Sequence, residues 1–328
     1  MKILMVGGTG IISTAVTEEI LKRGYELTLL NRGSKPVPKG VQSMIGDIND
    51  QLHMESLLEN KSYDVIIDWI AYTVEDVERD YQLFNGHTKQ YIYISSASAY
   101  KKPLPKEPIT EDWDLDNIYW TYSKNKQLSE ERLRELESVN FPVTIIRPSH
   151  TYNEKMLIVQ VKSHLKPFGI LNRIENDKPV VLPDKGTNLW TITSNTDFSK
   201  AFVDVIGNDK TYGETYHLTG DKTYNWKDIM GFYYKAFDKE PNIVYVPMDE
   251  LLTAFPEFRG ELLGDKDKDT VFDNSKIKAI APNYSSTTNY EDVAPKVVEY
   301  YKNHPELHCV DEAFEKRLDA LIKKMKNS

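Results

Sequence analysis

Tyr122 and Lys126 are the two residues of this chain whose types and spacing best suit proton transfer. They are four residues apart, so in a helix they share one face. A lysine ammonium beside a phenol favours the phenolate, and we expect it to lower the pKa of Tyr122 from its usual value of about 10. Such a tyrosine could exchange a proton with a substrate hydroxyl near neutral pH. The alternative is a tyrosine packed under a surface lysine.

Hydroxyl groups follow a short apolar run that precedes this pair. Tyr91 to Ser95 is typical of a buried strand, and the segment from Ser95 to Tyr100 contains three serines. Ligands of open parallel sheets lie at the carboxyl ends of the strands. We therefore expect a serine of this segment to hold the substrate oxygen that exchanges a proton with Tyr122.

The first residues of the chain predict a binding site for a dinucleotide. Met1 to Val6 is an apolar run typical of a buried parallel strand, and a glycine-rich turn and a helical pattern follow at once. Gly7 permits a tight turn, and Gly10 lets the backbone approach a pyrophosphate. The start of the helix attracts phosphate through its unpaired N–H groups and its dipole. Ser13 stands where this pattern has a third glycine, and serine is small enough for close packing.

The end of the second predicted strand, Tyr25 to Leu30, indicates which dinucleotide is bound. Asn31 and Arg32 follow it, with no carboxylate to hold the ribose 2′-hydroxyl of NAD. A guanidinium pairs well with phosphate, so Arg32 favours the 2′-phosphate of NADP, with NAD as the alternative. Arg32 could instead be a solvated surface charge.

Three further apolar runs, at 41–45, 63–70 and 141–146, continue the alternation of strands and helices. The sequence thus predicts an α/β protein with a Rossmann-type, doubly wound parallel sheet. Asp47 follows the first of these runs. It could accept a hydrogen bond from an adenine amino group, or cap the helix expected at 51–58.

The composition narrows the classes of function. The 328 residues carry a formal net charge of −9, which argues against an extended surface for nucleic acid. The single cysteine, Cys309, excludes an internal disulfide and a cysteine-based zinc site, and we expect no metal site. The chain starts with a strand rather than a signal peptide, and no apolar run approaches the length of a membrane span. We therefore expect a cytoplasmic protein.

Together these motifs resemble those of the extended short-chain dehydrogenase/reductase superfamily, in particular its NAD-dependent epimerase/dehydratase family. The resemblance implies that Tyr122 is the catalytic acid or base, and that Lys126 orients it and binds the nicotinamide ribose. It also implies that Ser96 holds the substrate oxygen, with Ser98 as the alternative. The matching segments are GGTGIIS, LLNRG, GDIND, SSASAY, YSKNK followed by Glu130, IIRPSHTY and residues 180–220.

The resemblance further implies two domains and a set of ligand contacts. An NAD(P)-binding Rossmann domain spans residues 1–152 and is rejoined by about 186–222, and a smaller C-terminal substrate domain spans residues 153–328. The expected cofactor contacts are Gly7, Thr9, Gly10, Ile11, Ile12, Asn31, Arg32, Asp47, Ile48, Ala71, Lys126 and Pro148. The expected substrate contacts are Ser98, His150, Tyr152, Lys155 and Trp190.

One departure from the family concerns the substrate. Many nucleotide-sugar epimerases have an arginine that binds diphosphate at the position of Trp190, and tryptophan lacks that capacity but could stack on a sugar. We expect an NADP-linked epimerase, dehydratase or reductase. It would act by Tyr-assisted hydride transfer on a hydroxyl or keto group of a sugar-like small molecule, and it could form a homodimer. The alternative is a non-catalytic nucleotide-dependent or RNA-associated protein on the same fold.

Overall fold

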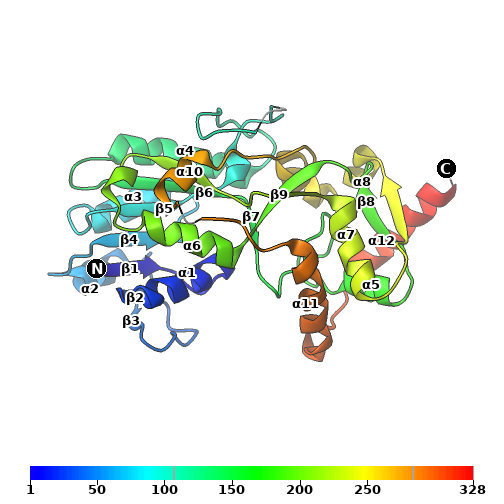
Figure 1. Ribbon diagram of the computed structural model, residues 1–328, viewed down its shortest axis with the longest axis horizontal. Coiled ribbons are helices and arrows are strands. Elements are labelled where there is room, and N and C mark those ends of the chain that lie inside the picture. Colours follow the sequence, from blue (N-terminus) through cyan, green and yellow to red (C-terminus); the bar gives the residue numbers. More distant parts are fainter. Residues whose placement is uncertain (106–107, 283, 328) are drawn as a thin grey trace.

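The computed structural model describes residues 1–105, 108–282 and 284–327. Two lobes lie side by side along the longest axis of the molecule, with β7 (His150–Tyr152) and β9 (Leu189–Ser194) between them (Figure 1). The lobe with the N-terminus is built on a large sheet, and the other lobe is mostly helical and ends at the C-terminus (Figure 1).

The large sheet has seven strands, all paired in parallel, in the order β10-β6-β5-β4-β1-β2-β3. This order confirms the doubly wound sheet that the sequence predicts. The winding changes direction between β1 and β4, and ligands of such sheets bind at this point of the carboxyl edge. The strands are β1 (Lys2–Val6), β2 (Glu26–Asn31), β3 (Gln42–Ile45), β4 (Val65–Asp68), β5 (Tyr91–Ile94), β6 (Val143–Pro148) and β10 (Thr215–Leu218).

Helices cover both faces of this sheet. Ile3 and Met5 of β1 pack in one core with α1 (Ile11–Lys22) and α6 (Asn195–Val205). Their neighbours Leu4 and Val6 belong to the core on the opposite face. Because both faces are buried, β1 is one unbroken apolar run in the sequence. The helices over the second core are α2 (Gln51–Leu58), α3 (Val74–Phe84) and α4 (Thr121–Leu136).

The chain returns to the sheet lobe twice. α6 and β10 join this lobe as expected, whereas β9 pairs with β7 and with β11 (Thr223–Asn225) in a separate three-stranded sheet. A second return, at α10 (Ser275–Ile280), was not predicted. Ile277 and Tyr284 bury their side chains in the same core as α6. Residues 153–328 are therefore not one continuous substrate domain.

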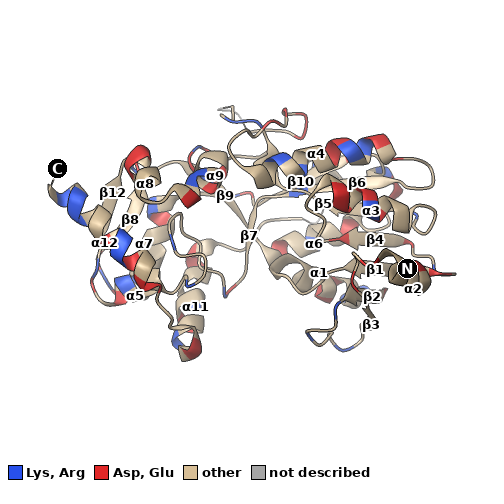
Figure 2. Ribbon diagram, turned by 180° about the vertical axis from the view of Figure 1, so that it is seen from behind, with Lys and Arg blue, Asp and Glu red and all other residues tan. Residues whose placement is uncertain are grey.

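In the second lobe, helices surround a parallel pair of strands, β8 (Val180–Pro183) and β12 (Ile243–Val246). Acidic and basic residues are interspersed along helices of both lobes (Figure 2). None of the described helices combines the length and the apolar composition that crossing a bilayer demands. The remaining helices are α5 (Gly169–Glu175), α7 (Trp226–Ala236), α8 (Met248–Ala254), α9 (Arg259–Glu261), α11 (Tyr290–Lys302) and α12 (Glu312–Asn327).

We predict that Arg147→Ala destabilises the fold strongly. The Arg147 guanidinium donates three hydrogen bonds to the buried carboxylate of Glu130, from Nε to Oε1 at 3.0 Å and to Oε2 at 3.2 Å, and from Nη2 to Oε2 at 2.6 Å. Removing it leaves that carboxylate buried without its cation, which typically costs about 3–5 kcal/mol. Urea unfolding of the variant measures this loss. Arg134→Ala removes a more exposed guanidinium, which lies in α4 and pairs with Glu137, and should change the stability far less. Equal losses would contradict the prediction.

Candidate active site

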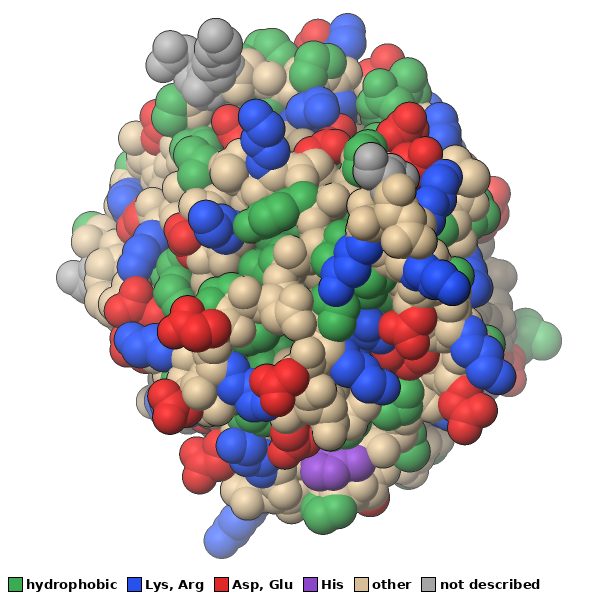
Figure 3. Space-filling view, turned by 90° about the vertical axis from the view of Figure 1, so that its right-hand side faces the viewer, with side chains coloured by type: hydrophobic (Ala, Val, Ile, Leu, Met, Phe, Trp, Pro, Cys, Tyr) green, Lys and Arg blue, Asp and Glu red, His purple; other side chains and the backbone are tan. Residues whose placement is uncertain are grey.

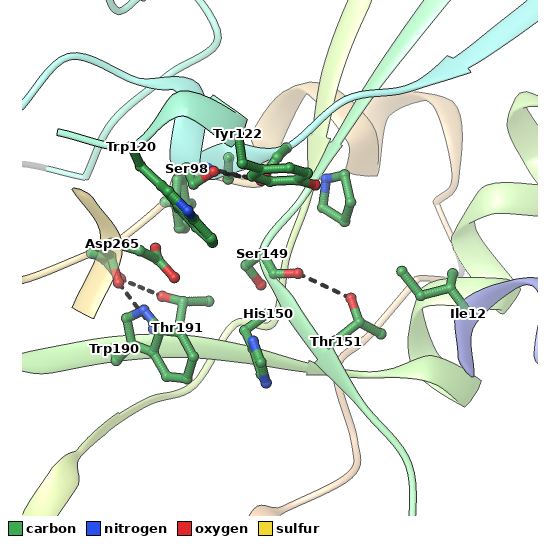
Figure 4. A pocket seen from close by; sticks show the side chains of 15 residues that line it. Ile12, Ser98, Trp120, Tyr122, Ser149, His150, Thr151, Trp190, Thr191 and Asp265 are labelled. Carbon is green, nitrogen blue, oxygen red and sulfur yellow. Dashed lines mark hydrogen bonds between the residues drawn. The ribbon is translucent and has the colours of Figure 1, made fainter. Parts of the chain in front are cut away.

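A cavity of about 290 Å³ lies at the carboxyl edge of the large sheet, between residues of both lobes (Figure 4). Ile12, from the first turn of α1, lies at one end of the cavity, and Trp190 and Asp265 lie at the other (Figure 4). The lining residues are Ile12, Ser96, Ala97, Ser98, Trp120, Tyr122, Pro148, Ser149, His150, Thr151, Trp190, Thr191, Asp265, Thr270 and Phe272.

The structure brings Tyr122 and the two predicted serines to the same side of this cavity. Ser96 caps a short 3₁₀ turn, η1 (Ala97–Ala99), by accepting the N–H of Ser98. The hydroxyl oxygens of Ser96 and Ser98 are 2.9 Å apart, and the Ser123 hydroxyl donates to Ser98 at 2.7 Å. This chain of hydrogen bonds holds both serine hydroxyls beside the phenol.

The pKa of Tyr122 differs from the expectation. Burial raises it to about 12, and a hydrogen bond with the Ser96 hydroxyl lowers it only in part. The expected lowering by Lys126 is therefore wrong for this arrangement, in which the Lys126 Nζ lies 5.9 Å from the centre of the phenol ring. At neutral pH the phenol is protonated.

The side chain of Lys126 is buried at the carboxyl ends of β4 and β5. Its Nζ donates to the carbonyl oxygens of Ala71 and Ile94, both at 2.7 Å. The rings of Tyr72 and Tyr93 flank the ammonium at 4.6 and 4.7 Å from their centres. Burial lowers the pKa of Lys126 to about 8, although Asp68 and Glu130 favour its charged form. This buried position excludes the alternative of a tyrosine under a surface lysine.

The glycine turn has the backbone geometry that a phosphate-binding loop requires. Gly7 and Gly8 have φ angles of +92° and +95°, and a Cβ at Gly8 would come within 2.7 Å of a Leu29 methyl group. α1 begins after Gly10, and no side chain caps its first turn. Ser13 accepts the Gly10 N–H at 2.9 Å and is buried, so this serine fixes the turn and also allows close packing.

The other expected cofactor contacts follow neighbouring strands. Asn31 ends β2 and accepts the Gly33 N–H at 2.8 Å, while Arg32 is exposed beside it. Asp47 is exposed and accepts the Asn49 N–H at 3.0 Å. The cap of α2 is Asp50 rather than Asp47, because Asp50 accepts the N–H of the third helical residue. Thr9 is exposed, Ile11 is half-buried, and Ile48 and Ala71 are buried.

His150 and Trp190 both border the cavity. Burial and the nearby Lys266 and Lys162 lower the pKa of His150 to about 3, so the imidazole is neutral. Its Nε2 has no hydrogen-bond partner among the described residues. Trp190 is 1% exposed and packs between His150 and Trp226, with ring centres 4.7 and 4.3 Å away. Its faces are therefore not free to stack on a sugar, contrary to the expectation.

Tyr152 and Lys155 do not line the cavity that contains Tyr122. Tyr152 is 1% exposed and meets Tyr290 edge to face at 4.8 Å in the core of the second lobe. Both residues border a different cavity of about 530 Å³, together with residues of α1 and α11. They were expected as substrate contacts, but the structure places them at this other cavity.

Trp120 and Asp265 are lining residues that the sequence analysis missed. Trp120 lies against the Tyr122 ring at 4.9 Å between centres, and the backbone of Gly260 and Gly264 closes over it. A Cβ at either glycine would approach the Trp120 side chain to 2.6 and 2.9 Å, respectively. Asp265 belongs to a π-helical turn, η4 (Leu262–Lys266). No sequence motif marks it, because it shares the cavity with Tyr122 only through the tertiary fold.

Comparisons with known proteins identify the class. Residues 3–218 match the NAD dependent epimerase/dehydratase family, so the chain belongs to this family, as the motifs predicted. The class is therefore that of NAD-dependent short-chain dehydrogenase/reductase enzymes. Its members bind a nicotinamide cofactor on this fold.

Two curated relatives show how widely activities diverge at this distance. The chloroplast stem-loop binding protein of 41 kDa b of Arabidopsis thaliana is 26% identical over 260 aligned positions, and the alignment covers 74% of this chain and 65% of that protein. The chain thus spans just under two thirds of this relative. The 2′-dehydrokanamycin reductase of Streptomyces kanamyceticus is 22% identical over 87% of this chain and 80% of that protein.

Solved structures confirm the fold. An epimerase from Methanothermobacter thermautotrophicus superposes with a TM-score of 0.73 at 15% identity, covering 94% of each chain. The UDP-glucuronic acid 4-epimerase of Bacillus cereus, solved with UDP-glucuronic acid and NAD, gives a TM-score of 0.71 at 18% identity. It covers 92% of this chain and 99% of that one.

We predict that Tyr122 does not ionise near neutral pH in the protein without cofactor. Its pKa of about 12 follows from burial, which disfavours the charged phenolate. Ultraviolet titration of the protein and of Tyr122→Phe, followed by the tyrosinate band, isolates this one phenol. The two curves should coincide up to about pH 10, the ordinary tyrosine pKa. A tyrosinate that is lost in the variant between pH 7 and 9 would show the prediction to be wrong.

Proposed function

We propose that this protein is an NADP-linked oxidoreductase or epimerase that transfers hydride to or from a sugar-like substrate, with Tyr122 as the proton-transfer group. The observation that carries the proposal is the shared cavity of Tyr122, Ser96 and Ser98, one end of which is Ile12 in the first turn of α1 (Figure 4). Tyr122, both serines and the first turn of α1, which follows the glycine turn, thus border one cavity.

The residues present fit a dinucleotide. The turn at Gly7 and Gly8 would not accept a Cβ at Gly8, and the uncapped first turn of α1 leaves N–H groups for phosphate. An ammonium has three donors, and Lys126 uses two on the Ala71 and Ile94 carbonyls. In the proposal, the third donor would pair with a ribose hydroxyl. A bound nicotinamide would supply or accept the hydride.

Tyr122 carries the proton in the proposed reaction. Its protonated phenol can donate to a keto oxygen as that oxygen gains electron density, and the phenolate can take the proton back in the reverse direction. Ser96 and Ser98 would hold the same oxygen, because their hydroxyls are linked to each other and to Ser123. The role of Lys126 in this proposal is to fix this helical turn through the carbonyls of Ala71 and Ile94.

Arg32 supports NADP over NAD. It is exposed at the carboxyl end of β2, next to Asn31, and neither residue is an acid that would hold a 2′-hydroxyl or repel a 2′-phosphate. The Bacillus cereus structure contains NAD, so NAD is the alternative.

A second candidate function is RNA binding without catalysis, because the Arabidopsis thaliana relative is named as a stem-loop binding protein. Two observations favour the redox proposal instead. The net charge is −9, and on the face drawn in Figure 3 basic and acidic side chains are interspersed rather than gathered in a basic stripe. The cytoplasmic location and the homodimer stay predictions.

The cofactor proposal predicts that NADPH raises the unfolding temperature of the protein. A ligand at about 100 times its dissociation constant stabilises the folded state by about 2.7 kcal/mol. Arg32→Ala should weaken NADPH binding about tenfold or more, and NADH binding much less, because only NADPH loses a charge-assisted contact. Calorimetry measures both affinities. Lys89→Ala, which removes a cation before β5 at the amino edge of the sheet, is the control. Equal losses for both cofactors would rule out phosphate recognition by Arg32.

The catalytic proposal predicts that Tyr122→Phe lowers kcat by about 10²-fold or more while cofactor affinity is unchanged, because only the proton donor is lost. Nicotinamide absorbance with a panel of sugars and nucleotide sugars measures the rate. Tyr119→Phe, on a half-exposed ring that does not line the cavity, should keep full activity. Persistence of turnover in Tyr122→Phe would refute the assignment of the proton donor.

A further inference from the structure

The lining of the catalytic cavity carries an unusual charge for an enzyme that would bind a nucleotide sugar. Hydroxyl-bearing and aromatic side chains form most of the wall, and the described lining includes neither lysine nor arginine. His150 is neutral because burial lowers its pKa to about 3. Asp265 is thus the charged side chain of this lining. A diphosphate bound in this cavity would contact the Asp265 carboxylate and no lysine or arginine of the described lining.

Asp265 lies at the end of the cavity away from Ile12, near Trp120 and Trp190 (Figure 4). A hydrogen bond from Trp190 favours its carboxylate, whereas burial raises its pKa. Lys102 and Lys266 attract it, but no ion pair within 4 Å joins it to a described cation. The Lys266 ammonium pairs with Glu261 instead. Asp265 is therefore a partly buried carboxylate without a direct counter-ion.

Trp120 provides an aromatic wall between this carboxylate and the reacting phenol. Its ring lies 4.9 Å from that of Tyr122, and Gly260 and Gly264 leave no room for it to shift toward η4. The indole face attracts cations, and a carboxylate beside it adds a full negative charge. Because a desolvated carboxylate is costly until it is paired, a cationic ligand would remove a cost that the free protein carries.

We infer that the substrate is an amino sugar, whose ammonium group binds between Asp265 and Trp120 while a hydroxyl or keto group on the same ring faces Tyr122. The inference rests on the proposed function of Tyr122. Trp190, at the same end of the cavity, supplies no cation for a diphosphate. The cavity of about 290 Å³ is also at the small end of the range for ligand sites.

Calorimetric titration near pH 7 tests whether the cavity prefers an ammonium-bearing sugar. The probes include glucosamine and glucose, which differ only by the amino group. Glucosamine, glucose and UDP-glucose are each titrated into the full-length protein saturated with NADPH. Glucosamine should bind about tenfold or more tightly than glucose, because a charged hydrogen bond is gained, and UDP-glucose should bind no more tightly than glucose. Asp265→Asn, which keeps the shape and removes the charge, should abolish the preference for glucosamine. Asp249→Asn, on the exposed side of α8, removes the same charge elsewhere and should preserve it.

Equal binding of glucosamine and glucose, tighter binding of UDP-glucose, or an unchanged preference in Asp265→Asn each overturns the inference. None of these results affects the proposed function, whose tests are cofactor binding and the activity of Tyr122→Phe. If Asp265→Asn does not fold, the comparison of glucosamine with glucose in the unmodified protein still decides the question.

Discussion

The buried ammonium of Lys126 joins the carboxyl ends of two neighbouring strands, and the rest of the site depends on it. Its two hydrogen bonds end on the carbonyls of Ala71, after β4, and Ile94, at the end of β5. An ammonium taken out of water requires such partners, and the fall of its pKa to about 8 shows the cost of burial. Because the sheet fixes both carbonyls, Lys126 fixes the start of α4, and Tyr122 lies one turn earlier on the same helix face.

A second buried group ties this contact to the glycine turn. Asp68, at the end of β4, accepts the N–H groups of Ile70 and Ala71 at 2.5 and 2.8 Å, and so shapes the turn that presents the Ala71 carbonyl to Lys126. Ile70 borders Gly7, where a Cβ would lie 3.1 Å from its side chain. The glycine turn and the helical turn of Tyr122 and Lys126 are therefore held by one short segment.

The two ends of the cavity are built by different means. The end near Ile12 and Pro148 comes from strand and helix ends of the sheet, whose parallel pairing brings them to one edge. The end near Trp120 and Asp265 comes from segments far apart in the sequence, packed together through Gly260 and Gly264. The proposed proton-transfer group thus lies on the framework of the large sheet, whereas the proposed ammonium contact lies on segments that only the tertiary fold brings to it.

The sequence alone was enough to determine the doubly wound sheet, the glycine turn and the placement of Tyr122 with Lys126 on one helix, because each depends on residues a few positions apart. Only the tertiary structure decided the pKa of Tyr122, which burial raises while Lys126 turns to backbone carbonyls. It also separated Tyr152 from the site, enclosed the faces of Trp190, and brought Asp265 into the cavity. The burial of a side chain and the charges near it depend on every segment packed around it. A local sequence pattern contains no information about those distant segments.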